Sequence, residues 1–297
     1  MPERMWRRGP DGEIVRTEPR EESPPAPDEE PPGGAGRPLP RPRLTLALRL
    51  GVRDAYDYLG TVLLQSFLWS AALGFGSLGA VALGLQLFRG LPGPLSLAST
   101  VLLATLAAVL IGGPLAAGIF RFCRNAAARS EPELFDLAWG VRHAAGRSLA
   151  LAGLQAGAAL LLAGNAAFYL SSRHPVVLVI GALFAYLLVF WLLMACYAWP
   201  LLAEQEISTR AILKKSALLV LDNLVYTLLL GVLLLVFTAV CWGTFIVGVL
   251  LWAGVSAMVL TQAMRELLRR YGVLPPDPTL DPMADETHEL RGHGRHE

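Results

Sequence analysis

The chain of 297 residues is 54% hydrophobic and only 16% charged, and its mean hydropathy is +0.48. A soluble domain does not need that much apolar surface, and a formal net charge of +1 without a basic stripe argues against a nucleic-acid partner. Charged residues and prolines crowd both ends of the chain, and the apolar runs between them are long enough to cross a bilayer, which takes about 20 residues per helix.

Both ends of the chain are predicted to be disordered tails. Residues 1–45 are rich in Pro, Gly and charges of both signs, and they contain too few bulky apolar residues to bury a core. Residues 272–297 are likewise polar. Residues 46–271 are therefore the predicted membrane domain.

Six apolar stretches predict an all-α fold, a polytopic membrane helix bundle with six transmembrane helices. In chain order the stretches are 58–83, 98–120, 149–170, 176–200, 224–240 and 245–264. Basic residues cluster before the first stretch and after every second one, whereas the alternate connections hold Arg89, then Arg173, then no basic residue. By the positive-inside rule both termini are cytoplasmic. The preference for Arg over Lys is typical of a GC-rich bacterial genome, so we expect the bacterial inner membrane.

Two of the cytoplasmic connections predict amphipathic helices that lie along the membrane interface. The first connection carries Ser130 and Glu133 at capping-box spacing, and the second carries Ser208 as a helix N-cap. We expect Glu204 to pair locally with Arg210, Lys214 and Lys215; the alternative is that it binds a coupling ion or a substrate. Both helices could present a docking surface, and the candidate docking residues are Leu134, Trp139, Arg142, Glu204, Arg210 and Lys214.

The predicted spans hold almost no ionisable residue, which argues against proton-driven transport. Three neutral polar residues, Gln65, Gln155 and Asn165, either hydrogen-bond helix to helix or line a polar path. Gly112, Gly113 and Pro114 predict a kink in the second span, because proline removes a backbone donor and glycine does not resist bending.

Five tryptophans include several near the predicted span ends, a position typical of interfacial aromatic belts. They are Trp69, Trp191, Trp199, Trp242 and Trp252.

No catalytic signature is visible, since GxSxG, HExxH, Walker A and dinucleotide-binding patterns are missing in a fitting context. The three cysteines, Cys123, Cys196 and Cys241, lie in separate apolar segments without CxxC spacing and are interpreted as reduced. We therefore expect neither an enzyme nor a cofactor.

Two segments resemble the YesL-like bacterial membrane proteins, a family of unknown function. "GPLAAGIFRFCRNAAARSEPELFDLAWGVRHAAGRSL" (113–149) is similar to that family's Gly-Pro helix end, basic turn and amphipathic helix, and "YAWPLLAEQEISTRAILKKSALL" (197–219) to its second hallmark. Asp222-Asn223 and the long N-terminal tail depart from the pattern. The resemblance implies an association with sugar ABC transporters and supplies no catalytic residues.

These observations lead to two functional hypotheses. The first is a non-enzymatic inner-membrane protein, accessory or regulatory to a carbohydrate uptake system, whose partners are the lipid bilayer and either ABC permease subunits or further copies of itself. The alternative is a secondary transporter of a small neutral solute, in which Gln65, Gln155 and Asn165 face a shared cavity.

Overall fold

The computed structural model describes residues 6–8, 14–16, 42–130, 132 and 135–274, and the chain divides into two units. In the first unit, Met1–Leu39, strand β1 (Trp6–Arg8) pairs antiparallel with β2 (Ile14–Arg16), and Trp6 lies opposite Arg16. The sequence did not predict this strand pair. Apart from these strands, the start of α1 and the residues just after α9, both predicted tails lie outside the described residues.

The second unit, Pro40–Glu297, is built from helices throughout its described residues. In chain order they are α1 (Leu44–Asp57), α2 (Leu59–Leu87), α3 (Gly93–Ala127), α4 (Asp136–Arg142), α5 (Ala145–Leu170), α6 (Pro175–Glu204), α7 (Thr209–Asp222), α8 (Leu224–Gly243) and α9 (Phe245–Arg270). Six of them, α2, α3, α5, α6, α8 and α9, are long and apolar enough to cross a membrane. The predicted all-α polytopic bundle is therefore confirmed.

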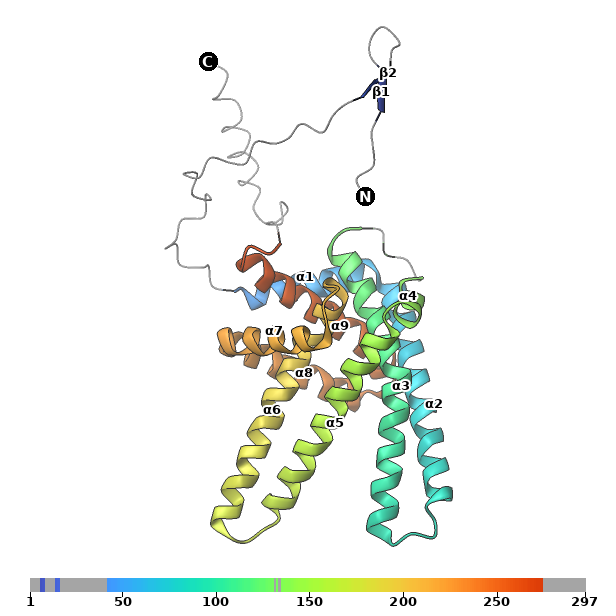
Figure 1. Ribbon diagram of the computed structural model, residues 1–297, viewed down its shortest axis with the longest axis vertical. Helices are drawn as coiled ribbons and strands as arrows, with labels where there is room; N and C mark the ends of the chain where they lie inside the picture. Colours follow the sequence, from blue (N-terminus) through green and yellow to red (C-terminus); the bar gives the residue numbers. More distant parts are fainter. Residues whose placement is uncertain (1–5, 9–13, 17–41, 131, 133–134, 275–297) are drawn as a thin grey trace. The chain divides into compact units, whose positions relative to one another are not determined.

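Two long hairpins, α2–α3 and α5–α6, form much of the bundle (Figure 1). A proline stands in the first turn of both return helices, α3 and α6, where its missing N–H costs nothing and its fixed φ favours the helix. Helix α9 contacts α1, α2, α3, α6 and α8, so it holds the elements together.

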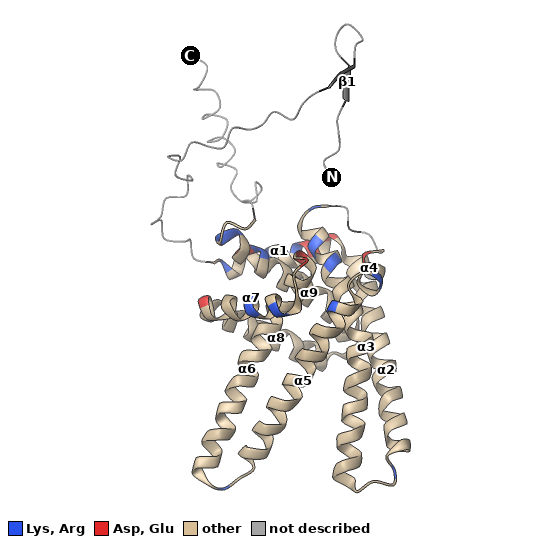
Figure 2. Cartoon of the chain, in the orientation of Figure 1, with Lys and Arg blue, Asp and Glu red and all other residues tan. Residues whose placement is uncertain are grey.

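The short helices α1, α4 and α7 gather at one end of the bundle, which we call the charged end (Figure 1). Lys and Arg side chains concentrate there, whereas the long helices beyond it are almost free of charge (Figure 2). The α2–α3 turn carries Arg89 and the α5–α6 turn carries Arg173, while the α8–α9 turn carries no charged residue. The basic residues on which the positive-inside argument rests are therefore gathered at one end of the bundle.

Helix α1 was missed by the sequence analysis, which predicted only two interfacial helices. Its buried residues, Ala47, Gly51 and Ala55, recur every four positions and so form one face. A Cβ on Gly51 would lie 2.9 Å from the Cα of Val259, so glycine is what lets α1 lie directly against α9. The pattern was hard to read because the buried face consists of small residues set among arginines.

The two predicted helix starts had different outcomes. Ser208 does cap α7, because its Oγ accepts a hydrogen bond from the backbone N–H of Ala211 at 3.4 Å. Ser130 does not cap α4, which begins later, at Asp136. The Ser130 hydroxyl instead donates to the carbonyl of Asn125 and so belongs to the end of α3.

Candidate functional site

A cavity of about 470 Å³ lies at the centre of the bundle, and all six long helices contribute to its wall. Much of the wall consists of small residues, such as Ala108, Ala156 and Ala195, which leave space between the helices. Leu73, Val109 and Leu260 supply larger apolar surface. A site of this size and apolar character is typical of small-molecule binding sites.

No Asp, Glu, Lys, Arg or His is among the described residues that line the cavity. Its hydroxyl groups are largely occupied, because Thr105 donates to the carbonyl of Val101 at 2.8 Å and Thr238 donates to that of Leu234 at 2.7 Å. Gln155 and Ser256 supply further polar side chains. The Ser256 Oγ is buried without a hydrogen-bond partner among the described residues. The cavity is therefore suited to an uncharged molecule with few hydrogen-bonding groups.

Two of the three predicted kink residues line this cavity. Gly112 and Gly113 line it, and α3 continues as one helix through Pro114. A Cβ on Gly112 would approach Leu73 of α2 at 3.0 Å, and one on Gly113 would approach Ala152 of α5 at 3.1 Å. The two glycines thus permit close helix packing on both sides of α3, while the kink itself stays a prediction.

Two pairs of aromatic rings line the cavity, Phe120 with Trp199 nearer the charged end and Trp69 with Trp252 nearer the α8–α9 turn. Phe120 of α3 and Trp199 of α6 both line it, and their rings stack with centroids 6.3 Å apart and planes 14° apart. Phe120 is buried. Trp69 and Trp252 line the same cavity, with ring centroids 5.4 Å apart. The indole N–H of Trp252 donates to Thr238 at 2.9 Å, which fixes that ring across α8 and α9.

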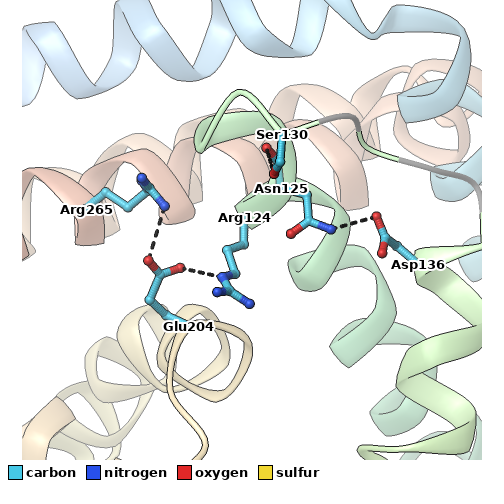
Figure 3. A network of polar contacts seen from close by, with 6 residues as sticks. All are labelled: Arg124, Asn125, Ser130, Asp136, Glu204 and Arg265. Carbon is cyan, nitrogen blue, oxygen red and sulfur yellow. Dashed lines mark hydrogen bonds and ion pairs between the residues drawn. The ribbon is translucent and has the colours of Figure 1, made fainter. Parts of the chain in front are cut away.

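An ion cluster lies about one helical turn beyond the aromatic rings, toward the charged end. Its carboxylate belongs to Glu204 of α6, which pairs with Arg124 of α3 at 3.3 Å and with Arg265 of α9 at 3.1 Å (Figure 3). The Glu204 and Arg265 side chains are only 10% and 11% exposed. Glu204 does not pair with Arg210 or the lysines as predicted; a carboxylate between two guanidinium groups instead joins three spans.

Of the three residues predicted to share a cavity, Gln155 alone is among the residues that line this one. The backbone carbonyl of Gln155 accepts a hydrogen bond from the indole N–H of Trp191 at 3.2 Å. Asn165 is not among the lining residues, and its amide donates to the carbonyl of Leu161 in its own helix. Gln65 is fully buried away from the lining, and its amide finds no partner among the described residues.

The candidate docking residues are also divided. Arg142, Arg210 and Lys214 are exposed. Trp139 is half-buried, with the Arg121 guanidinium 4.5 Å above its ring. Glu204 belongs to the ion cluster, and Leu134 lies outside the described residues.

The sequence did not predict that Trp69, Trp199 and Trp252 line a cavity, because a tryptophan in an apolar span has the same sequence signature whether its ring faces a cavity or the membrane. The belt interpretation did not anticipate this cavity, and the depth of these three rings in the membrane stays a prediction. Within the described part of the chain, no group of three or more His, Cys, Asp or Glu side chains is placed to hold a metal ion.

Comparisons with protein-family models, with curated proteins and with solved structures found no match.

Proposed function

We propose that the protein is a non-enzymatic carrier of the bacterial inner membrane, which binds the uncharged, largely apolar part of its cargo in the central cavity. The observation that carries this proposal is that all six spans contribute to one cavity whose described lining holds no Asp, Glu, Lys, Arg or His. A cavity shared by every span can change shape when the helices move against each other, which a carrier requires. The cavity thus favours the carrier alternative over a purely accessory role.

The proposal can be tested with bromobenzene, an uncharged heavy-atom quencher, added to the purified protein in detergent. Because three tryptophans line the cavity, bromobenzene bound there should quench their fluorescence. Ala195→Phe fills the cavity from α6, and Ala182→Phe places the same ring at an exposed position of the same helix. Quenching should fall in Ala195→Phe and remain in Ala182→Phe. Equal quenching in all three proteins would contradict binding in the cavity.

A second candidate function is the accessory role, in which the protein is YesL-like and docks on a permease subunit of a carbohydrate ABC system. The specific observation in its favour is α7, which buries Ile212, Ser216 and Val220 on one side and exposes Arg210 and Lys214. An exposed cationic pair on a firmly packed helix is a surface that a partner with an acidic patch can recognise.

Charge reversal tests this second candidate. The double variant Arg210→Glu and Lys214→Glu should lose capture of the permease subunit from native membranes, whereas Arg53→Glu, an exposed charge on α1, should retain it. Both variants should insert into the membrane normally. Unchanged capture by the double variant would rule out α7 as the docking surface.

A further inference from the structure

The hairpin formed by α8 and α9 extends less far from the charged end than the α2–α3 hairpin beside it. The Ser70 hydroxyl of α2 donates to the carbonyl of Val249 in α9 at 3.1 Å, so these two residues lie at the same level. From this level α2 continues to Leu87, about 25 Å at 1.5 Å per residue, whereas α9 reaches its first residue, Phe245, after about 6 Å. The α8–α9 turn therefore ends about 20 Å short of the α2–α3 turn along the helix direction.

The chemistry of the turns agrees with a short hairpin that ends inside the bilayer. The side chains beside the α8–α9 turn, Trp242, Phe245 and Ile246, are 83%, 79% and 73% exposed and wholly apolar or aromatic. The two longer hairpins instead place Arg89 and Arg173 at their turns. Charged turns belong at the membrane surface, and no charged side chain holds the α8–α9 turn there.

The opposite placement is unfavourable. If the α8–α9 turn marked the membrane surface, the outer parts of α2, α3, α5 and α6 would stand in water. Those parts expose large apolar side chains, among them Leu87, Leu97, Phe168 and Val179. An exposed apolar surface of that extent is not stable in water. The longer hairpins therefore span the bilayer, and the α8–α9 hairpin covers only the part nearer the charged end.

A short third hairpin opens a path from the bilayer to the cavity. Trp252 and Thr238, which line the cavity, lie close to the α8–α9 turn, and beyond that turn the two longer hairpins diverge (Figure 1). On the other side the Phe120–Trp199 stack and the Glu204 ion cluster block the way to the charged end. We infer that the cavity binds the hydrocarbon chain of a membrane lipid, which enters sideways from the bilayer beneath the α8–α9 turn.

The lining favours a hydrocarbon chain over a sugar. A sugar needs a hydrogen-bond partner for each buried hydroxyl; the Thr105 and Thr238 hydroxyls already donate within their own helices, and Gln155 and Ser256 are too few to serve a sugar's hydroxyls. The volume of about 470 Å³ is roughly three times that of the engineered apolar cavity of about 150 Å³ that holds one benzene. This inference rests on the proposed function, because it names the cargo class of the same cavity.

The inference can be tested by photocrosslinking in phosphatidylcholine vesicles in which one acyl chain carries a diazirine near its end. After irradiation of the full-length protein, mass spectrometry should find crosslinks at Val109 and Ala156, inside the cavity, as well as on the outer helix surfaces. Ala195→Phe, and independently Ala156→Phe, should lose the cavity crosslinks and keep the outer ones. Ala182→Phe should give the wild-type pattern.

The outcomes separate this inference from the proposed function. Cavity crosslinks that disappear in both filling variants support a lipid chain as the cargo. The cavity crosslinks could instead be missing from the wild type while bromobenzene still quenches the wild type more than Ala195→Phe. In that case the lipid inference is wrong and the proposed function stands. If neither signal depends on the cavity, both fail. Crosslinks at Val109 and Ala156 that persist in both filling variants also overturn the inference.

Discussion

At the scale of single residues, Glu204 shows how one carboxylate can hold a bundle together. It is the acceptor for guanidinium groups from two other spans, and its side chain is largely shielded from water. Removing one member of such a group leaves the remaining charges without compensation. The loss is large because the two arginines then repel each other in a region of low dielectric constant.

We therefore expect Glu204→Gln to lower the free energy of unfolding in detergent by about 3 kcal/mol. The matched variant is Glu206→Gln, two residues further along the chain and exposed, which should change it by less than about 0.5 kcal/mol. Denaturant titration followed by tryptophan fluorescence measures both. Similar values for the two variants would show that the ion cluster contributes little to stability.

Asp54 of α1 predicts a pH dependence. Burial raises the pKa of its carboxyl above the ordinary value of 3.8, and a hydrogen bond from the amide of Gln262 partly opposes that rise. A carboxyl whose pKa is raised on folding binds its proton more tightly in the folded protein. Its contribution to stability is therefore fully present below pH 3.8 and is lost as the pH rises through the raised pKa.

Asp54→Asn should remove this part of the pH dependence of the unfolding temperature, because the amide does not titrate. Gln262→Ala should move the loss to higher pH, since it removes the hydrogen bond that lowers the Asp54 pKa. Thermal unfolding measured across the acidic and neutral range distinguishes the two. A wild-type profile in Asp54→Asn would assign the dependence to other groups.

At the scale of elements, α4 lies against α3 with backbone touching backbone. A Cβ on Gly140 would lie 2.3 Å from the backbone nitrogen of Gly118 and 2.5 Å from the carbonyl oxygen of Pro114. Both neighbours are main-chain atoms inside a helix, so they cannot yield as a flexible side chain does. The position of α4 therefore depends on this one missing methyl group.

Gly140→Ala should destabilise the protein by about 1–3 kcal/mol, the usual cost of overpacking, despite the better helix propensity of alanine. Gly146→Ala, near the start of α5, would place its Cβ in open space and should be neutral or slightly stabilising. Unfolding free energies of the two variants provide the comparison. Equal stability would mean that α4 can move away from α3 at no cost.

The elements also show what a single sequence can and cannot predict. The six spans were predictable because an uninterrupted apolar run has few alternatives to a membrane helix. Helix α1 was not, since its packed face is made of Ala47, Gly51 and Ala55. The cavity could not be predicted either: its tryptophans resemble belt residues, and the partners of Glu204 are far away in sequence, at Arg124 and Arg265.

At the scale of the whole membrane unit, the two ends differ in how tightly their helices are held together. The charged end is closed, with three short helices, a stacked aromatic pair and an ion cluster that joins three spans. The other end consists of hairpins of unequal reach with small turns. In the proposed carrier, cargo exchange is expected at the far end, because opening the charged end would require the Glu204 pairs to break.

This asymmetry predicts three labelling behaviours for single cysteines, placed in a protein whose Cys123, Cys196 and Cys241 are replaced by Ala. In spheroplasts, a membrane-impermeant maleimide should label Gly90→Cys, because the predicted orientation brings the α2–α3 turn to the outer surface. Lys214→Cys, on α7, should react only after permeabilisation, because the positive-inside rule predicts that the basic end faces the cytoplasm. Thr244→Cys should react under neither condition, although its position is exposed on the isolated chain, because hydrocarbon covers the α8–α9 turn.

The pattern of labelling identifies which assumption fails. Labelling of Lys214→Cys before permeabilisation would reverse the orientation and leave the fold untouched. Rapid labelling of Thr244→Cys together with Gly90→Cys would place the α8–α9 turn in water. The longer hairpins α2–α3 and α5–α6 would then project far beyond the bilayer and expose their leucines to water. Such an apolar surface is stable only if a second protein covers it.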